Sequence, residues 1–126
     1  MKELEIQKRI MLALSQEGCT VWRNATARAW VGRLKGYTSA GDAVISDAKQ
    51  LLFGLAEGSS DLVGITPCGR FLAVEVKSRE GGERDNQERF RRAVNRAGGI
   101  AYIARSPEEA VSQLYAANAC QWGRYE

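Results

Sequence analysis

The sequence contains no histidine, and this absence narrows the chemistry that the chain can perform. Imidazole is a common general base and a frequent zinc ligand, so mechanisms and metal sites that need it are excluded. A hydrolytic site in this chain must therefore use carboxylates, lysine and a hard metal ion that prefers oxygen ligands.

Long apolar runs and paired cysteines are also lacking. No run approaches the roughly 20 apolar residues that a transmembrane helix needs, and residues 1–3 lead into an amphipathic pattern and not a signal peptide. Cys19, Cys68 and Cys120 are isolated and form no C-x-x-C pair, which indicates inert thiols in a reducing compartment. We therefore expect a cytoplasmic protein without a membrane partner.

Length and composition predict one compact domain over residues 1–126. The chain is 44% hydrophobic and 26% charged, which is typical of a globular domain and not of a disordered segment. Its net charge of +3 is too small to identify a nucleic-acid-binding protein by itself. The basic residues are clustered, however, and such clusters bind phosphates or simply line a solvated face. One cluster is early (Arg23, Arg28, Arg33, Lys35) and one lies in a later helix (Arg84, Arg89, Arg91, Arg92, Arg96).

Periodicity and end signals predict alternating helices and strands. We expect a helix over 2–16, a strand over 20–23 and a hairpin of 61–66 with 70–78. A second helix is expected to have Asp85 as its N-cap, with Glu88 completing a capping box, and to be stopped by Gly98 and Gly99. A strand over 100–104 and a final helix with Ser106 as its N-cap follow. Residues 24–58 show a poor pattern that fits a hairpin or loose strands with Gly36 and Gly41 at turns. The order predicts an α/β fold in which helices flank a central mixed sheet.

The predicted 61–78 hairpin carries the residues that suggest chemistry. Glu75 and Lys77 are two apart, so they project from the same face of a strand. Phe71 and Ala73 share that face, which is therefore expected to be covered. If the strand that begins at Asp61 pairs with this one, two carboxylates and one ammonium group converge, enough to hold a divalent metal and a hydrolytic water. The alternative is an ordinary charged pair on the wet face of a hairpin.

Two further polar residues are expected on buried helix faces. Gln87 shares a face with Phe90 and Val94, whereas a glutamine bonded locally in the first turn is the alternative. Glu3 shares a stripe with Gln7, and the alternative for Glu3 is an acid stabilised by the helix dipole.

These motifs together are similar to a known family. GSSDLVGI (58–65), FLAVEVKS (71–78) and DNQERF (85–90) resemble the PD-(D/E)xK nuclease superfamily and, more narrowly, the small stand-alone VRR-NUC proteins of bacteriophages. The resemblance covers about residues 3–110. Ser60 stands where the family often has proline, which changes the stiffness of the loop and removes no ligand.

The resemblance implies a restriction-endonuclease-like α-β-β-β-α-β core and a DNA-cleaving metal site. Asp61, Glu75 and the carbonyl of Val76 are expected to bind Mg²⁺ or Mn²⁺. Lys77 is expected to orient the attacking water, and Gln87 falls where the family has a glutamine facing the metal.

Small relatives imply further roles and partners. Glu3 matches a glutamate that assists the site, and Arg23 and Asn24 match a stretch that contacts DNA. A homodimer that cuts four-way junctions or other branched DNA is expected, in the host-cell cytoplasm if the chain is phage-encoded. The alternatives are a non-selective nicking nuclease and an inactive DNA-binding module. Several apolar residues fit either a dimer surface or ordinary core packing: Trp22, Trp30, Leu51, Leu52 and Phe53.

Overall fold

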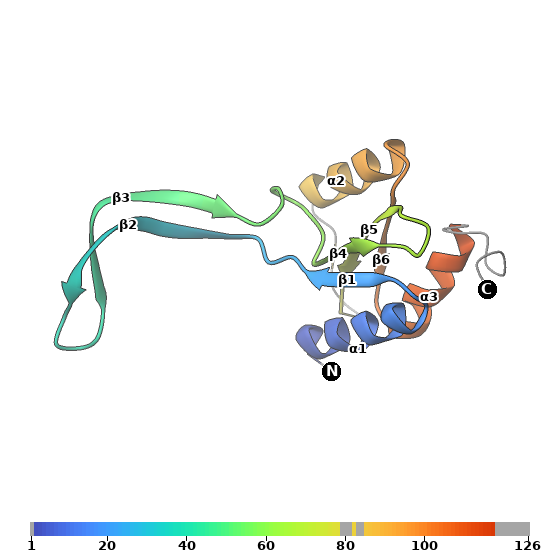
Figure 1. Cartoon of the computed structure of the whole chain (residues 1–126), viewed down its shortest axis with the longest axis horizontal. Helices are drawn as coiled ribbons and strands as arrows, with labels where there is room; N and C mark the ends of the chain where they lie inside the picture. Colours follow the sequence, from blue (N-terminus) through green and yellow to red (C-terminus); the bar gives the residue numbers. More distant parts are fainter. Residues whose placement is uncertain (1, 79–81, 83–84, 118–126) are drawn as a thin grey trace.

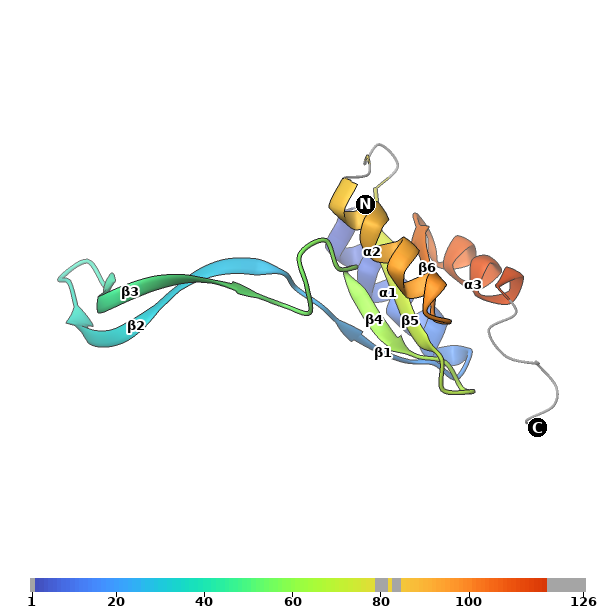
Figure 2. The same cartoon turned by 90° about the horizontal axis from the view of Figure 1, so that it is seen from above.

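The chain consists of an α/β body and a long β-hairpin arm that projects from it (Figures 1 and 2). The structure is a computed structural model, and it describes residues 2–78, 82 and 85–117. The elements in chain order are α1 (Glu3–Gln16), β1 (Thr20–Arg23), β2 (Ala27–Tyr37), β3 (Ala43–Phe53), β4 (Leu62–Ile65), β5 (Phe71–Val76), α2 (Asp85–Arg96), β6 (Ile100–Ala104) and α3 (Pro107–Ala116).

The body is built on a four-stranded mixed sheet with the strand order β1-β4-β5-β6. The three strand pairs follow directly from the connections. A tight turn at 67–69 joins β4 to β5, so these strands are antiparallel, whereas α2 carries the chain across to β6, which is parallel to β5. The predicted α/β architecture with a central mixed sheet is therefore confirmed.

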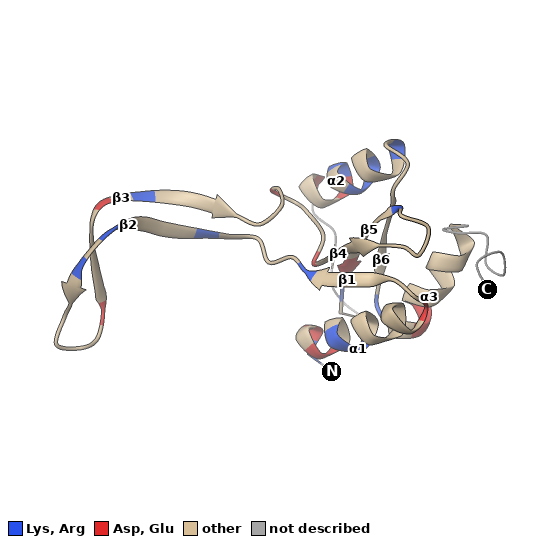
Figure 3. Ribbon diagram, in the orientation of Figure 1, with Lys and Arg blue, Asp and Glu red and all other residues tan. Residues whose placement is uncertain are grey.

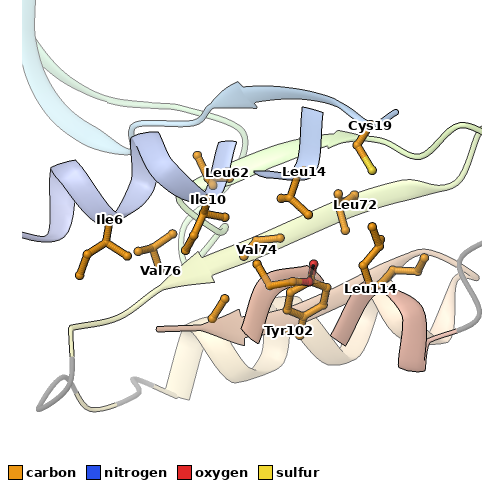
Figure 4. Packing of buried hydrophobic residues seen from close by; sticks show 13 residues of the cluster. Ile6, Ile10, Leu14, Cys19, Leu62, Leu72, Val74, Val76, Tyr102 and Leu114 are labelled. Atoms are coloured by element: carbon orange, nitrogen blue, oxygen red, sulfur yellow. Dashed lines mark hydrogen bonds between the residues drawn. The ribbon is translucent and has the colours of Figure 1, made fainter. Parts of the chain in front are cut away.

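One face of the sheet carries the hydrophobic core (Figure 4). Leu62, Leu72 and Val74 point to this face and are no more than 1% exposed. They pack with Ile10 and Leu14 of α1 and with residues of α3 in one buried cluster. Alternate residues of β5 project to the opposite face, where α2 lies. The sheet thus separates the core from the face that presents Glu75.

Local sequence signals define several helix ends. The side chain of Ser106 accepts a hydrogen bond of 3.1 Å from the backbone N–H of Glu109, so Ser106 is the N-cap of α3 as predicted. Gly18 adopts a φ of +89° after α1, a conformation that favours glycine. Asp85 is the first residue of α2, so it lies within the first turn and not before it.

The arm is the antiparallel hairpin of β2 and β3, residues 27–53. Its pairing runs from Ala27–Phe53 to Tyr37–Ala43, with two β-bulges on the way. The sequence allowed a hairpin or loose strands here, and the hairpin is what forms. Gly41 lies in its turn, but Gly36 lies within β2.

Core packing, one of the two explanations for the apolar residues of this region, is wrong. All of them are exposed, between 43% and 64% of their surface: Trp22, Trp30, Leu51, Leu52 and Phe53. The poor sequence pattern therefore reflects an arm that buries neither face against its own chain.

The cysteines differ from the expectation in one respect. Cys19 is a free, buried thiol, and burial followed by the nearby charge of Glu17 raises its pKa to about 11. Cys68, however, is disulfide-bonded, so the prediction of inert thiols is wrong for this residue. Among the described residues, no helix is long and apolar enough to span a bilayer.

Two leucines in α1 provide a matched test of the core. Leu14→Ala should lower the free energy of unfolding by about 2–4 kcal/mol, because it leaves a cavity under the sheet. Leu12→Ala, in the same helix at 61% exposure, should change it by less than about 0.5 kcal/mol. Urea unfolding followed by circular dichroism measures both, and equal losses in the two variants would contradict this packing.

Candidate metal-binding and catalytic site

Asp61 is fixed at the entry to β4 by contacts at its backbone and its side chain. Its carbonyl accepts a hydrogen bond of 2.7 Å from the backbone N–H of Asn24 at the end of β1. Its carboxylate Oδ2 accepts a hydrogen bond of 2.9 Å from the backbone N–H of Val76 at the end of β5. The first acid is therefore attached to the strand that carries the second.

Glu75, Lys77 and Gln87 form a connected group of side chains. Gln87 Nε2 donates to Glu75 Oε1 at 3.2 Å, while Gln87 Oε1 accepts from Lys77 Nζ at 3.0 Å. Lys77 Nζ also lies 3.7 Å from Glu75 Oε1. The side chains of Lys77 and Glu75 are only 12% and 4% exposed, so the contact between them is shielded from water. The structure thus brings Gln87 of α2 to the two residues of the E-x-K motif.

Two charged residues of α2 lie on its outer side, away from the site. Glu88 and Arg92 form an exposed ion pair of 3.0 Å there. Arg91, which shares the inner face with Gln87, is close enough for its charge to act on Glu75.

Burial and a neighbouring acid make Glu75 hard to ionise. Burial, then a hydrogen bond and charge repulsion from Asp61, raise the pKa of Glu75 to about 8, although Lys77 and Arg91 oppose this. Its second oxygen, Oε2, is buried and receives no hydrogen bond from a donor in the described part of the chain. Two carboxyl groups in contact need a proton or a cation between them, so this oxygen is suited to a metal ion.

The acids open into a cleft of about 500 Å³ at the junction of the body and the arm. Basic and polar side chains surround the acids there. The lining includes Gln7, Arg23, Asn24, Arg28, Glu57, Asp61, Glu75, Asn86 and Gln87. Arg28 lies 3.9 Å from Glu57 at the root of the arm, and both are well exposed. Anions that approach the acids therefore meet arginine side chains first.

Asn24 is engaged within the protein and not directed into solvent. Its side-chain nitrogen donates to Ser59 Oγ at 2.7 Å and to the carbonyl of Ser60 at 2.9 Å. Its side-chain oxygen accepts from the backbone N–H of Leu55 at 3.1 Å. Asn24 thus fastens the 55–60 loop that leads into Asp61. Local sequence patterns do not predict this role, because the residues that Asn24 bonds are more than 30 positions away.

Glu3 is not among the residues that line the cleft. It is exposed in the first turn of α1, so it does not approach the buried side as expected. Gln7, one turn later on the same stripe, lines the cleft instead. The helical spacing correctly identified the stripe, but only its second polar residue reaches the site.

Comparison with known proteins agrees with this geometry. The sequence model of the VRR-NUC domain matches residues 1–108. This chain belongs to the VRR-NUC family. A solved structure described as a VRR_NUC domain is 18% identical and aligns over 90% of this chain and 94% of its own, with a TM-score of 0.55. None of the curated proteins matches the chain.

Membership of the VRR-NUC family gives the chain a nuclease-type fold. The likeness to the solved structure extends to the mixed sheet and its flanking helices. A nuclease domain acts on DNA, and the arginines beside the acids are consistent with such a substrate.

The donor set fits a hard divalent metal. Asp61 and Glu75 supply carboxylate oxygens, and the described residues contain no group of three or more acidic, cysteine or histidine ligands. A metal held by these two acids would need further oxygen ligands from the backbone, water or the substrate, as Mg²⁺ sites commonly have.

The raised pKa of Glu75 predicts how stability without metal depends on pH. The unfolded carboxyl ionises near pH 4.5 and the folded one near 8, so the folded protein binds more protons between these values. Stability should therefore fall as pH rises through this window. Glu75→Gln cannot ionise, and in EDTA it should match the parent near pH 5 and exceed it by roughly 1–3 kcal/mol near pH 8.5.

The measurement is urea unfolding at several pH values in EDTA. Glu57→Gln is the control, because Glu57 lines the same cleft but is exposed. The free energy of unfolding of this variant should follow that of the parent at every pH. A constant difference between Glu75→Gln and the parent at all pH values would contradict the buried acid pair.

Proposed function

We propose that the chain is a metal-dependent endodeoxyribonuclease that hydrolyses phosphodiester bonds. The observation that carries the proposal is the contact of Asp61 with the Glu75–Gln87–Lys77 group in a cleft bordered by arginines. A structural ion pair has no need of a second acid pressed against the first. The buried, donor-free oxygen of Glu75 supports a cation as the missing partner.

Asp61 and Glu75 hold the metal in this proposal, together with the carbonyl of Val76. When bound there, Mg²⁺ or Mn²⁺ would supply Lewis-acid chemistry, polarising the scissile phosphate and lowering the pKa of a water. The Val76 N–H holds Oδ2 of the Asp61 carboxylate, and this carboxylate interacts with that of Glu75 in the lining of the cleft. This arrangement positions both acids before a ligand arrives, which reduces the cost of organising the site.

Lys77 acts on the reacting phosphate. Its ammonium group orients the attacking water and stabilises the negative charge that develops on the phosphate oxygens. Gln87 holds this ammonium group through Oε1 while Nε2 restrains Glu75, so one amide sets the distance between the two. Water attacks phosphorus, the bond to the 3′ oxygen breaks, and the products carry a 5′-phosphate and a 3′-hydroxyl.

DNA enters along the arginine-bearing side of the cleft. Arg23 and Arg28 are placed to contact the phosphate backbone, which positions a duplex without reading its sequence. Asn24 contributes by holding the loop before Asp61 and not by direct contact. Glu3, exposed at the start of α1, retains only a supporting role at the edge of the site.

Branched DNA is the proposed substrate, with a homodimer as the active form. Backbone contacts without base reading suit recognition of DNA shape. Two symmetric cuts at a four-way junction need two sites held at a fixed separation, and a two-fold dimer provides this most simply.

Substitutions in the cleft separate metal binding from catalysis. Cleavage should require Mg²⁺ or Mn²⁺ and stop in EDTA. Asp61→Asn should abolish both Mn²⁺ binding, measured by calorimetry, and cleavage. Lys77→Ala should keep Mn²⁺ binding but lower kcat by about 10²–10³-fold, because the ammonium group that orients the water and stabilises charge is lost while both carboxylate ligands remain.

Two controls accompany these variants. Glu57→Gln removes another carboxylate of the cleft and should keep Mn²⁺ binding, while Lys8→Ala removes an exposed lysine of α1 and should keep kcat. Cleavage at the full rate in EDTA would contradict a metal-dependent mechanism. Normal Mn²⁺ binding by Asp61→Asn would show that Asp61 is not a metal ligand.

Selectivity is tested with junctions and linear duplexes of the same sequence. The protein should cut a four-way junction at least tenfold faster than linear DNA at equal concentration. Equal rates would favour a non-selective nicking nuclease. Binding of both without cleavage in either metal would favour an inactive DNA-binding module.

A further inference from the structure

The arm lacks the packing that normally stabilises a β-hairpin. Among the described elements, β2 and β3 pack extensively only on each other, and neither strand contains a buried residue. Both outer edges of the arm are unpaired within the described part of the chain. An isolated two-stranded hairpin is at best marginally stable in water, so an arm of this length needs another layer.

The arm is apolar on both of its faces. The strand register places Trp30, Leu34 and Leu52 on one face. Leu51 and Phe53 lie on the other face, opposite Ala29 and Ala27. A hairpin that lies on the surface of its own domain has one polar face. A hairpin with two apolar faces is suited to lie between two layers of protein.

The exposed apolar area matches what a stable dimer needs. Seven large apolar residues of the arm are between 43% and 69% exposed. A fully exposed aromatic side chain covers roughly 150–250 Å² and an aliphatic one somewhat less, so the seven residues, three of them aromatic, together expose on the order of 700 Å². Each partner in a standard protein interface buries about 800 Å². The seven residues are Trp30, Leu34, Tyr37, Val44, Leu51, Leu52 and Phe53.

Charge on the arm favours protein over nucleic acid as the occupant. The arm carries four basic residues, but Asp42 and Asp47 are interspersed with them (Figure 3). Phosphate backbones select surfaces of one sign, and acids among the bases oppose them. Mixed charge around apolar side chains is instead typical of a contact between proteins.

A second copy of the chain is the partner that fits. The arm points away from its own body, so it can contact another molecule without a change in its orientation (Figures 1 and 2). The body also leaves apolar residues open on the sheet face that carries α2: Trp22 is 53%, Ile65 45% and Phe71 38% exposed. Each chain therefore has both an apolar arm and an apolar surface, as reciprocal two-fold association requires.

We propose that the arm is the dimerisation element: in a two-fold dimer, each copy of the chain lays its arm against the other copy. The proposal rests on the dimer of the proposed function but not on cleavage. It also links assembly to the site, because the arm begins just after Arg23 and ends shortly before Asp61.

The test replaces three residues of one arm face with threonine, which keeps the tendency to form strands. The variant Trp30→Thr/Leu34→Thr/Leu52→Thr should be monomeric by light scattering, at 13.9 kDa, whereas the parent should have twice this mass. The control Leu12→Gln changes an equally exposed apolar residue of α1 and should remain dimeric. Circular dichroism and the urea midpoint of the body show whether each variant is folded.

Two results would overturn the proposal: a monomeric parent, and a folded triple variant that remains dimeric. In the second case, binding of linear duplex by the variant is measured by fluorescence anisotropy, and weaker binding than by the parent would identify DNA as the occupant of the arm. A monomeric parent that still cleaves DNA leaves the nuclease proposal standing, and a dimer that depends on the arm but never cleaves leaves only the arm proposal.

If the triple variant does not fold, a milder single substitution tests the contribution of the arm to dimerisation. Tyr37→Thr removes one aromatic residue near the tip, 69% exposed, far from the root and the cleft. It should raise the dimer dissociation constant at least tenfold by sedimentation, and an unchanged constant would count against the arm.

Discussion

The contact between Asp61 and Glu75 is the constraint around which the rest of the body is arranged. Two carboxyl groups repel when ionised, and burial of Glu75 adds to the cost, which raises its pKa to about 8. Only a rigid frame keeps them together. The frame consists of β4 and β5 paired side by side, with a Val76 N–H that binds Asp61 and an amide of α2 that binds Glu75. The core on the opposite face of the sheet supplies the stability that this pair removes.

The arm and the acid pair share one point of attachment. Asn24 lies where the chain leaves β1 for the arm, and its side chain bonds the loop by which the chain returns. The backbone N–H of Asn24 bonds Asp61 itself. The root of the arm and Asp61 are therefore joined directly by the hydrogen bonds of Asn24. The proposed assembly through the arm and the organisation of the site would in this way be coupled, although they use separate surfaces.

Sequence reasoning succeeded where patterns are local and failed where they depend on distant partners. The E-x-K strand, the helix with Gln87 and the cap at Ser106 each follow from spacing over a few residues, and the structure has them where expected. The length of the arm did not follow, because periodicity assumes one buried face and the arm buries none in the monomer. Asn24 was singled out as a DNA contact, and its bonds to the 55–60 loop were not foreseen because the partners lie more than 30 residues away. Glu3 was expected on the buried side of α1 but is exposed. Helical spacing predicts which residues share a face, and it does not predict which turn of that face reaches the cleft.

The position of Gln87 explains how one site can serve both stability and catalysis. Without metal, its amide donates to Glu75 and accepts from Lys77, so it partly compensates the acid pair and keeps the ammonium group near it. An arginine or lysine at this position would neutralise Glu75 more fully and would compete with a metal ion. A leucine would remove the hydrogen-bond acceptor of Lys77 at a site where the lysine side chain is only 12% exposed, and would leave Glu75 as its remaining neighbour. A neutral side chain with both a donor and an acceptor therefore satisfies both neighbours while leaving the charge of the acids to a cation.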